Sequence, residues 1–127
     1  IANEKLSQVF DAIRFPRGVS YFSCKLAEKL LEQDQKWIKD QTRMIKKERE
    51  KLSQSLIKLG LFVYPSQANF LLVNFGKKAN EICQKLKENN ILVRDRSNKK
   101  YLEGCVRITI RNQNQNNILI NNLKKIL

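Results

Sequence analysis

The spacing of the apolar residues changes at Gly60, and this change limits what the chain can fold into. Before Gly60 the apolar residues recur at helical spacing, at Leu26, Leu30, Leu31, Trp37, Ile38, Met44, Ile45, Leu52, Leu56 and Leu59. After it, β-prone runs at 61–64, 69–75, 91–94 and 105–110 alternate with amphipathic stretches at 80–89 and 114–126. The predicted order is helix, helix, β, β, α, β, β, α. This order indicates an α/β or α+β fold with a small sheet covered by helices.

Two breaks are expected in the helical part. The run RFPRG at 14–18 ends the first helix, because Pro16 lacks an N–H and Gly18 permits positive φ. Ser20 is a suitable N-cap for the helix that follows. A second break or bend is expected near Asp34, since the neighbouring residues are polar and Asp caps helices well.

Several classes of site are excluded by composition. The chain has no His, so it can form neither a Ser-His-Asp triad nor a zinc site that contains His. Cys24, Cys83 and Cys105 lie far apart without a CxxC pair, and we expect three buried, reduced thiols and no metal. With only four Gly, no glycine-rich phosphate loop is encoded. No apolar run approaches the roughly 20 residues that span a bilayer.

The net charge of +13, from 25 Lys and Arg against 12 Asp and Glu, is the one unusual bulk property. It is compatible with a nucleic-acid surface, a membrane surface, an anionic small substrate or a solvated Lys-rich exterior. The lysines are scattered and the aromatics do not interleave with them, which favours solvated faces over nucleic acid. On this basis Lys46, Lys47 and Arg49 are expected on a solvated helix face, and Trp37 and Met44 in the core.

Two arginines are candidate anion ligands. In the run 105–110, alternation places Val106 and Ile108 on one face and Arg107 on the other, so a guanidinium sits in the middle of an apolar strand. Arg94 ends the preceding β-prone run. Two guanidinium groups on neighbouring strands can hold a carboxylate or phosphate by paired hydrogen bonds. The alternatives are that each arginine pairs with an internal acid or faces water.

The same segments carry a resemblance to a known family. YPSQANFLLVNF (64–75), ILVRDRSN (91–98) and LEGCVRITI (102–110) resemble, in order and spacing, the C-terminal part of fold-type I pyridoxal-phosphate aminotransferases of class I/II. The likeness is greatest to the histidinol-phosphate aminotransferases. IANEKL and RFPRGVS at the start also resemble segments of that family, so the likeness covers nearly the whole chain. It implies the small C-terminal domain, with a long linking helix and a mostly antiparallel sheet.

The resemblance implies an enzyme that uses pyridoxal 5'-phosphate to move an amino group between glutamate and imidazole acetol phosphate, giving histidinol phosphate and 2-oxoglutarate. By resemblance, Arg107 matches the arginine that grips the α-carboxylate of glutamate. Arg94 matches the arginine that helps to hold the substrate phosphate. Asn69 matches an Asn near the active-site cleft. The family implies a cytoplasmic homodimer of histidine biosynthesis, with neither nucleic acid nor membrane as a partner.

The resemblance also implies what the chain lacks. The family's Schiff-base lysine belongs to a segment before Ile1, so no residue here is assigned as catalytic, and the chain alone is expected to be inactive and not to bind the cofactor. Residues 1–33 are expected to belong to the large-domain or linker segment, and 34–127 to form the compact small domain. The sequence departs from the family at Arg17-Gly18, where Tyr-Asn is usual, and at Arg111-Asn112, where Gly-Thr is usual.

Arg111 is similar to the residue found in a sister group, the threonine-phosphate decarboxylases of cobalamin biosynthesis, which share the fold. Three readings therefore remain. The first is a histidinol-phosphate aminotransferase, the second a threonine-phosphate decarboxylase-like enzyme, and the third a basic nucleic-acid-binding module.

Overall fold

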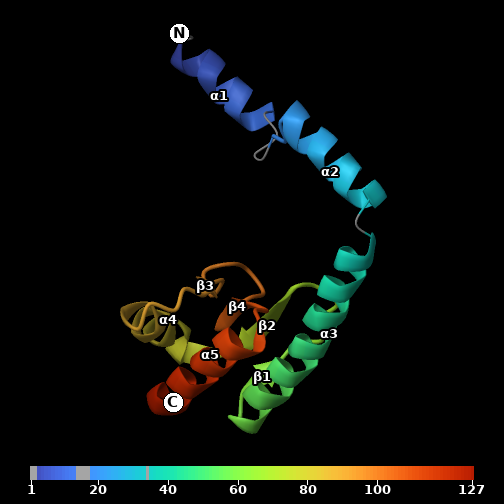
Figure 1. The fold of residues 1–127 in the computed structure, drawn as a ribbon. Helices are drawn as coiled ribbons and strands as arrows, with labels where there is room; N and C mark the ends of the chain where they lie inside the picture. Colours follow the sequence, from blue (N-terminus) through green and yellow to red (C-terminus); the bar gives the residue numbers. More distant parts are fainter. Residues whose placement is uncertain (1–2, 14–17, 34) are drawn as a thin grey trace. The chain divides into compact units, whose positions relative to one another are not determined.

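The computed structural model describes residues 3–13, 18–33 and 35–127 (Figure 1). Contacts divide the chain into two compact units, Ile1–Ile38 and Lys39–Leu127. The expected bend at Asp34 and most of the expected break at 14–18 lie outside the described residues. The assignment of 1–33 and 34–127 to different functional domains stays a prediction.

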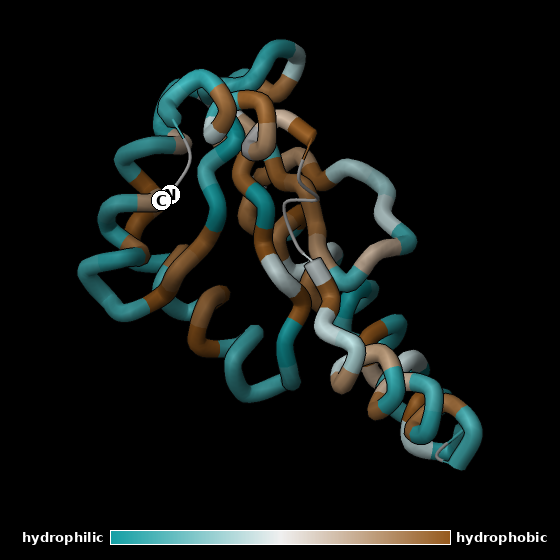
Figure 2. The backbone as a smooth tube through the Cα atoms, turned by 90° about the horizontal axis from the view of Figure 1, so that it is seen from above, coloured by the Kyte–Doolittle hydropathy of each residue, from teal (hydrophilic) through white to brown (hydrophobic). Residues whose placement is uncertain are grey.

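The first unit consists of helices whose apolar residues are exposed. Helix α1 spans Glu4–Ile13 and α2 spans Tyr21–Gln33. The Ser20 hydroxyl accepts a hydrogen bond from the Ser23 N–H at 3.1 Å, which confirms Ser20 as the cap of α2. Hydrophobic and hydrophilic residues alternate along the helical turns (Figure 2). No residue of α2 is buried.

The second unit is a four-stranded antiparallel sheet with helices. Its elements are α3 (Gln35–Lys58, which begins in the first unit), β1 (Phe62–Val63), β2 (Phe70–Asn74), η1 (Gly76–Lys78), α4 (Ala79–Glu88), β3 (Arg94–Asp95), β4 (Cys105–Thr109) and α5 (Gln113–Ile126) (Figure 1). The strand order is β1-β2-β4-β3, and every pairing is antiparallel. The predicted fold class is confirmed. The described residues form three helices, α1, α2 and α3, before β1, where the predicted order has two, and from β1 onward the order of strands and α-helices is as predicted.

The third strand differs from the expectation for 91–94. Of these four residues only Arg94 belongs to β3. The Ile91 N–H instead donates to the Leu86 carbonyl at 2.8 Å, and Asn90 takes a φ of 58°. These features close the C-terminus of α4, as a left-handed residue after a helix commonly does. The apolar run is therefore used to end the helix and to pack, and pairing begins only at Arg94.

The hydrophobic core lies on one face of the sheet. Its buried members are Leu52, Leu56, Leu71, Val73, Phe75, Ala79, Ile82, Leu86, Val106, Ile108, Ile110, Leu119 and Leu123. Helices α3, α4 and α5 each contribute to this cluster, and the strands contribute alternate residues. The three helices therefore cover the same face, as the period of two along a strand requires.

Some burial expectations are wrong. Cys105 is buried, but Cys83 is half-buried and Cys24 is exposed, and all three thiols are free. Burial, followed by the charge of Asp95, raises the pKa of the Cys83 thiol to about 11. Trp37 and Met44 are 59% and 37% exposed and do not belong to the core. None of the helices in the described ranges has the length and apolar character needed to cross a membrane.

Gly104 is the glycine whose replacement the fold tolerates least. Its φ is +75°, and a Cβ there would lie 2.8 Å from the Gly76 Cα and 2.9 Å from the Asn74 side-chain oxygen. The Gly104 carbonyl accepts from the Phe75 N–H at 2.8 Å, so the two segments cannot separate without losing that bond.

Gly104→Ala is expected to destabilise the chain by about 3 kcal/mol, because a left-handed φ costs about 1–2 kcal/mol and overpacking adds about 1–3. Gly76→Ala is the matched control, since Gly76 has a φ of +60° but no atom within 4 Å of its Cβ position. Gly76→Ala should lower the free energy of unfolding only by the cost of the left-handed φ, without the overpacking cost. Urea unfolding of both variants measures the difference, and equal losses would contradict the close approach at Gly104.

Candidate functional site

The face of the sheet opposite the core brings the two predicted arginines together. Arg94 and Arg107 are direct partners in the antiparallel pairing of β3 with β4. Residues directly opposite each other share a face and place their Cβ atoms about 5 Å apart. Leu72 of β2 pairs with Arg107 on its other side. The two guanidinium groups therefore project from adjacent strands on one side of the sheet.

Arg107 is held in a partly apolar setting. Its guanidinium carbon lies 5.0 Å from the centre of the Phe70 ring, within cation–π range. Its Nε is buried and has no hydrogen-bond partner. A buried donor without a partner costs about 1–3 kcal/mol. Such a donor fits a site that an anionic ligand completes.

Neither arginine is neutralised from within the described part of the chain. The ion pairs there, within 39–127, are Arg43–Asp40, Lys51–Glu48 and Lys85–Glu81. Like charges directly opposite on two strands are destabilising. Internal pairing, one alternative for these residues, is thus not what the structure shows. Arg94 lies on the edge strand and is exposed, so water reaches it, as the other alternative holds.

Asp95 lies between Arg94 and Arg96 in the sequence but is engaged elsewhere. The Ser97 N–H donates to its carboxylate at 2.7 Å. Hydrogen bonds from the Ser97 hydroxyl, then from the Ser97 N–H and the Asn80 side chain, hold the pKa of Asp95 below its ordinary value. Because Asp95 pairs with Val106 in the register, its side chain leaves the sheet on the face opposite to Arg94. The nearest acid in sequence therefore leaves the two arginines uncompensated.

Asn69, the third predicted site residue, is not in contact with the arginines. It immediately precedes β2, is exposed, and its carbonyl accepts from the Ile110 N–H at 2.9 Å. Ile110 is three residues from Arg107, which is roughly 10 Å along a strand. The structure thus places Asn69 at the end of the sheet where β2 begins and β4 ends. The role of Asn69 in binding stays a prediction.

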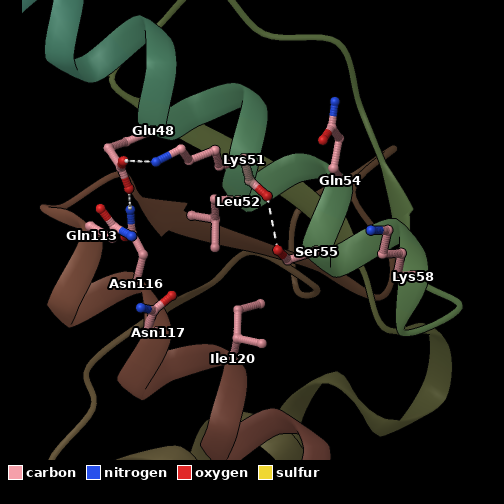
Figure 3. Close-up of a pocket in the computed structure, with 10 residues that line it drawn as sticks. All are labelled: Glu48, Lys51, Leu52, Gln54, Ser55, Lys58, Gln113, Asn116, Asn117 and Ile120. Carbon is pink, nitrogen blue, oxygen red and sulfur yellow. Dashed lines mark hydrogen bonds and ion pairs between the residues drawn. The ribbon is translucent and has the colours of Figure 1, made fainter.

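Sequence reasoning missed a polar connection between α3 and α5. Glu48 and Asn116 are each 5% exposed, and the Asn116 amide donates to the Glu48 carboxylate at 3.1 Å (Figure 3). The same amide donates to the Arg111 carbonyl at 2.8 Å. The signal was present, because Asn116 lies at helical spacing from the buried Leu119 and Leu123.

Arg49 was expected on a solvated face, and this is wrong. It is half-buried, and its guanidinium donates to the Ala68 carbonyl at 3.2 Å and to the Gln67 side-chain oxygen at 3.3 Å. The scattered basic pattern of the helix gave no sign of this contact.

In the described ranges, no group of three His, Cys, Asp or Glu residues is placed to hold a metal ion.

Comparisons with known proteins show which family the chain matches. Residues 4–123 match the family "Aminotransferase class I and II". The histidinol-phosphate aminotransferase of Thermoanaerobacter pseudethanolicus is 40% identical over 128 residues, which is 100% of this chain and 36% of that protein. The chain thus spans about a third of the length of this curated relative.

Two solved structures are also similar. One is the histidinol-phosphate aminotransferase of Sinorhizobium meliloti in complex with pyridoxal-5'-phosphate, with a TM-score of 0.72, 26% identity, and coverage of 97% of this chain and 35% of that one. The other is the L-threonine-O-3-phosphate decarboxylase of Porphyromonas gingivalis, with a TM-score of 0.69, 28% identity, and coverage of 99% and 40%.

Asp95→Asn is expected to lower the free energy of unfolding by less than about 1 kcal/mol near neutral pH, since the hydrogen bonds it weakens lie near the surface. The pKa of Asp95 is lower in the folded chain than its ordinary value of 3.8, so the carboxylate stabilises the fold above that pH. This stabilisation is lost as the pH falls through the folded pKa.

The difference between Asp95→Asn and the unmodified chain should therefore shrink on acidification. Urea unfolding of both proteins at neutral pH and at about pH 3 measures it. A difference that grew at low pH would contradict the assigned hydrogen bonds.

Proposed function

Because the chain belongs to the aminotransferase class I and II family, we propose that it supplies the substrate-anion-binding part of a pyridoxal-phosphate aminotransferase. The proposed reaction is the exchange of an amino group between glutamate and imidazole acetol phosphate, giving 2-oxoglutarate and histidinol phosphate. The observation that carries the proposal is the uncompensated pair Arg94 and Arg107 on one face of the sheet.

The proposed roles follow from the settings of the two arginines. Arg107, with a buried unpartnered Nε and a ring beside it, binds the α-carboxylate of glutamate in a fixed orientation. Arg94, exposed on the edge strand, binds the phosphate of the other substrate, which needs charge more than enclosure. Both substrates are anions, and a guanidinium group suits each.

The cofactor fits this assignment. Pyridoxal phosphate, when bound, supplies the electron sink for amino-group transfer, and the protein orients the substrate beside it. An orphaned buried donor fits the carboxylate of an amino acid held at such a cofactor. We assign no residue of this chain to the cofactor itself. The Schiff-base lysine in a preceding segment, the homodimer and the cytoplasmic location stay predictions.

A phosphoamino-acid decarboxylase is the second candidate. Arg111 stands where the aminotransferases usually have Gly, and its Nε donates to the Gln115 side-chain oxygen at 3.0 Å. The likeness to a threonine-phosphate decarboxylase structure supports this candidate. Turnover of threonine phosphate against histidinol phosphate by the complete protein separates the two.

Arg107→Gln in the complete protein is expected to lower kcat/KM for glutamate by about 100-fold or more, because removing one partner of a charged clamp costs several kcal/mol. Arg107→Lys should recover only part of this, since an ammonium lacks the planar fork. Steady-state kinetics with varied glutamate measures both variants.

The control is Arg43→Gln, which removes the same charge from an exposed position, where the Arg43 side chain is 80% exposed. It should leave kcat/KM unchanged. Unaltered glutamate kinetics in Arg107→Gln would refute the role of Arg107.

A further inference from the structure

We propose that Arg49 of α3 is a positioning residue for the substrate-anion site. It holds the 66–69 loop, the segment that carries Asn69 and leads into β2, and its neighbour Glu48 holds the segment that follows β4. This inference rests on the function proposed above, because it concerns how that site is kept in place. Arg49 is not placed in contact with substrate.

Arg49 fastens the 66–69 loop to α3. One terminal nitrogen of its guanidinium donates to the Ala68 carbonyl at 3.2 Å, and the other donates to the Gln67 side-chain oxygen at 3.3 Å. The residues joined are 18 and 19 positions apart in the sequence, so the contact is tertiary. A planar fork that reaches two acceptors fixes orientation as well as distance.

The 66–69 loop is also organised by its own side chains. The Ser66 hydroxyl donates to the Phe70 carbonyl at 2.7 Å and accepts from the Ala68 N–H at 3.1 Å. The Asn69 carbonyl accepts from the Ile110 N–H at 2.9 Å. From α3, the Arg49 guanidinium reaches this loop at two acceptors, the Ala68 carbonyl and the Gln67 side-chain oxygen. The loop is thus a preformed unit that Arg49 fixes to the helix.

Glu48 makes a corresponding connection to α5 and, through it, to the segment that follows β4. Its carboxylate accepts from the Asn116 amide at 3.1 Å and from the Lys51 ammonium at 3.2 Å (Figure 3). The Asn116 side chain also donates to the Arg111 carbonyl and accepts from the Arg111 N–H at 3.1 Å. Both polar groups of the Arg111 backbone are therefore bound to a side chain that Glu48 holds.

The two connections meet at one end of the sheet. In the antiparallel register Phe70 pairs with Thr109, so the residues before β2 and after β4 are neighbours. Adjacent residues of α3 therefore hold both segments at this end. A movement of α3 relative to the sheet would therefore displace the loop that carries Asn69. It would also displace the C-terminal end of β4, the strand that carries Arg107.

The first test measures the position of the loop without reference to catalysis. Hydrogen exchange in the complete protein is compared for Arg49→Gln, Arg49→Lys and the matched control Arg43→Gln, which loses the same charge from the same helix. Arg49→Gln should speed exchange at amides 68–70 by about tenfold, the equivalent of about one charge-assisted hydrogen bond. Exchange at Val73, in the middle of β2, should stay within about twofold of the unmodified protein.

Arg49→Lys should fall between Arg49→Gln and the unmodified protein, because an ammonium reaches one acceptor where the fork reaches two. Arg43→Gln should match the unmodified protein at every amide of the loop. Exchange at 68–70 in Arg49→Gln equal to that in Arg43→Gln overturns the proposal. So does a uniform rise across β2, which would mean a general loss of stability.

The second test measures glutamate kinetics in the same variants. Arg49→Gln should raise KM for glutamate about three- to tenfold with kcat within about twofold, because the binding groups are displaced while the chemistry is not. Faster exchange at 68–70 with an unchanged KM overturns the positioning role. If the unmodified protein does not transaminate glutamate, the proposed function fails, and the exchange experiment still decides whether Arg49 holds the loop.

Discussion

The burial of one face of the sheet is the constraint on which the candidate site depends, because it leaves two positive charges directly opposite each other on the other face. Arg94 and Arg107 are paired across β3 and β4, and no carboxylate of the described chain compensates them. The arrangement is unfavourable by itself. It is maintained because the opposite face of the same strands is buried under α3, α4 and α5, so the strands cannot turn over without exposing Val106 and Ile108.

The placement of both arginines on one face of the sheet follows from this burial. Once the core fixes which residues of β4 point inward, Arg107 must point outward, and the register with β3 places Arg94 beside it. Asp95 pairs with Val106 and takes the inward direction, where Ser97 and Asn80 bind its carboxylate. The same alternation that brings the two arginines together therefore removes the acid that stands next to Arg94 in the sequence.

The parts that sequence predicted are those fixed by periodicity. The helix before Gly60 and the order of the β-prone runs along the chain follow from the spacing of apolar residues. The shared face of Arg94 and Arg107 depends instead on the register of β3 with β4. Contacts between segments distant in sequence did not follow from the apolar spacing. Nothing near Arg49 indicates that its guanidinium reaches Ala68, and the closure of α4 by Ile91 depends on a backbone hydrogen bond. For Asn116, the helical spacing indicates that the side chain is buried, but it does not indicate that the partner is Glu48.

The free energy that the two arginines cost the folded chain is small compared with the stability of a domain of this size. An unpartnered buried Nε costs about 1–3 kcal/mol, and a directly opposed like-charge pair up to about 1 kcal/mol. A domain of this size is stable by about 5–15 kcal/mol, so the site takes up a real but tolerable share. In the function proposed above, the glutamate carboxylate at Arg107 supplies the missing hydrogen-bond partner, and the substrate phosphate at Arg94 offsets the repulsion between the two charges. A carboxylate bound as proposed would give the buried Nε of Arg107 a partner, so ligand affinity and domain stability would be coupled through this residue.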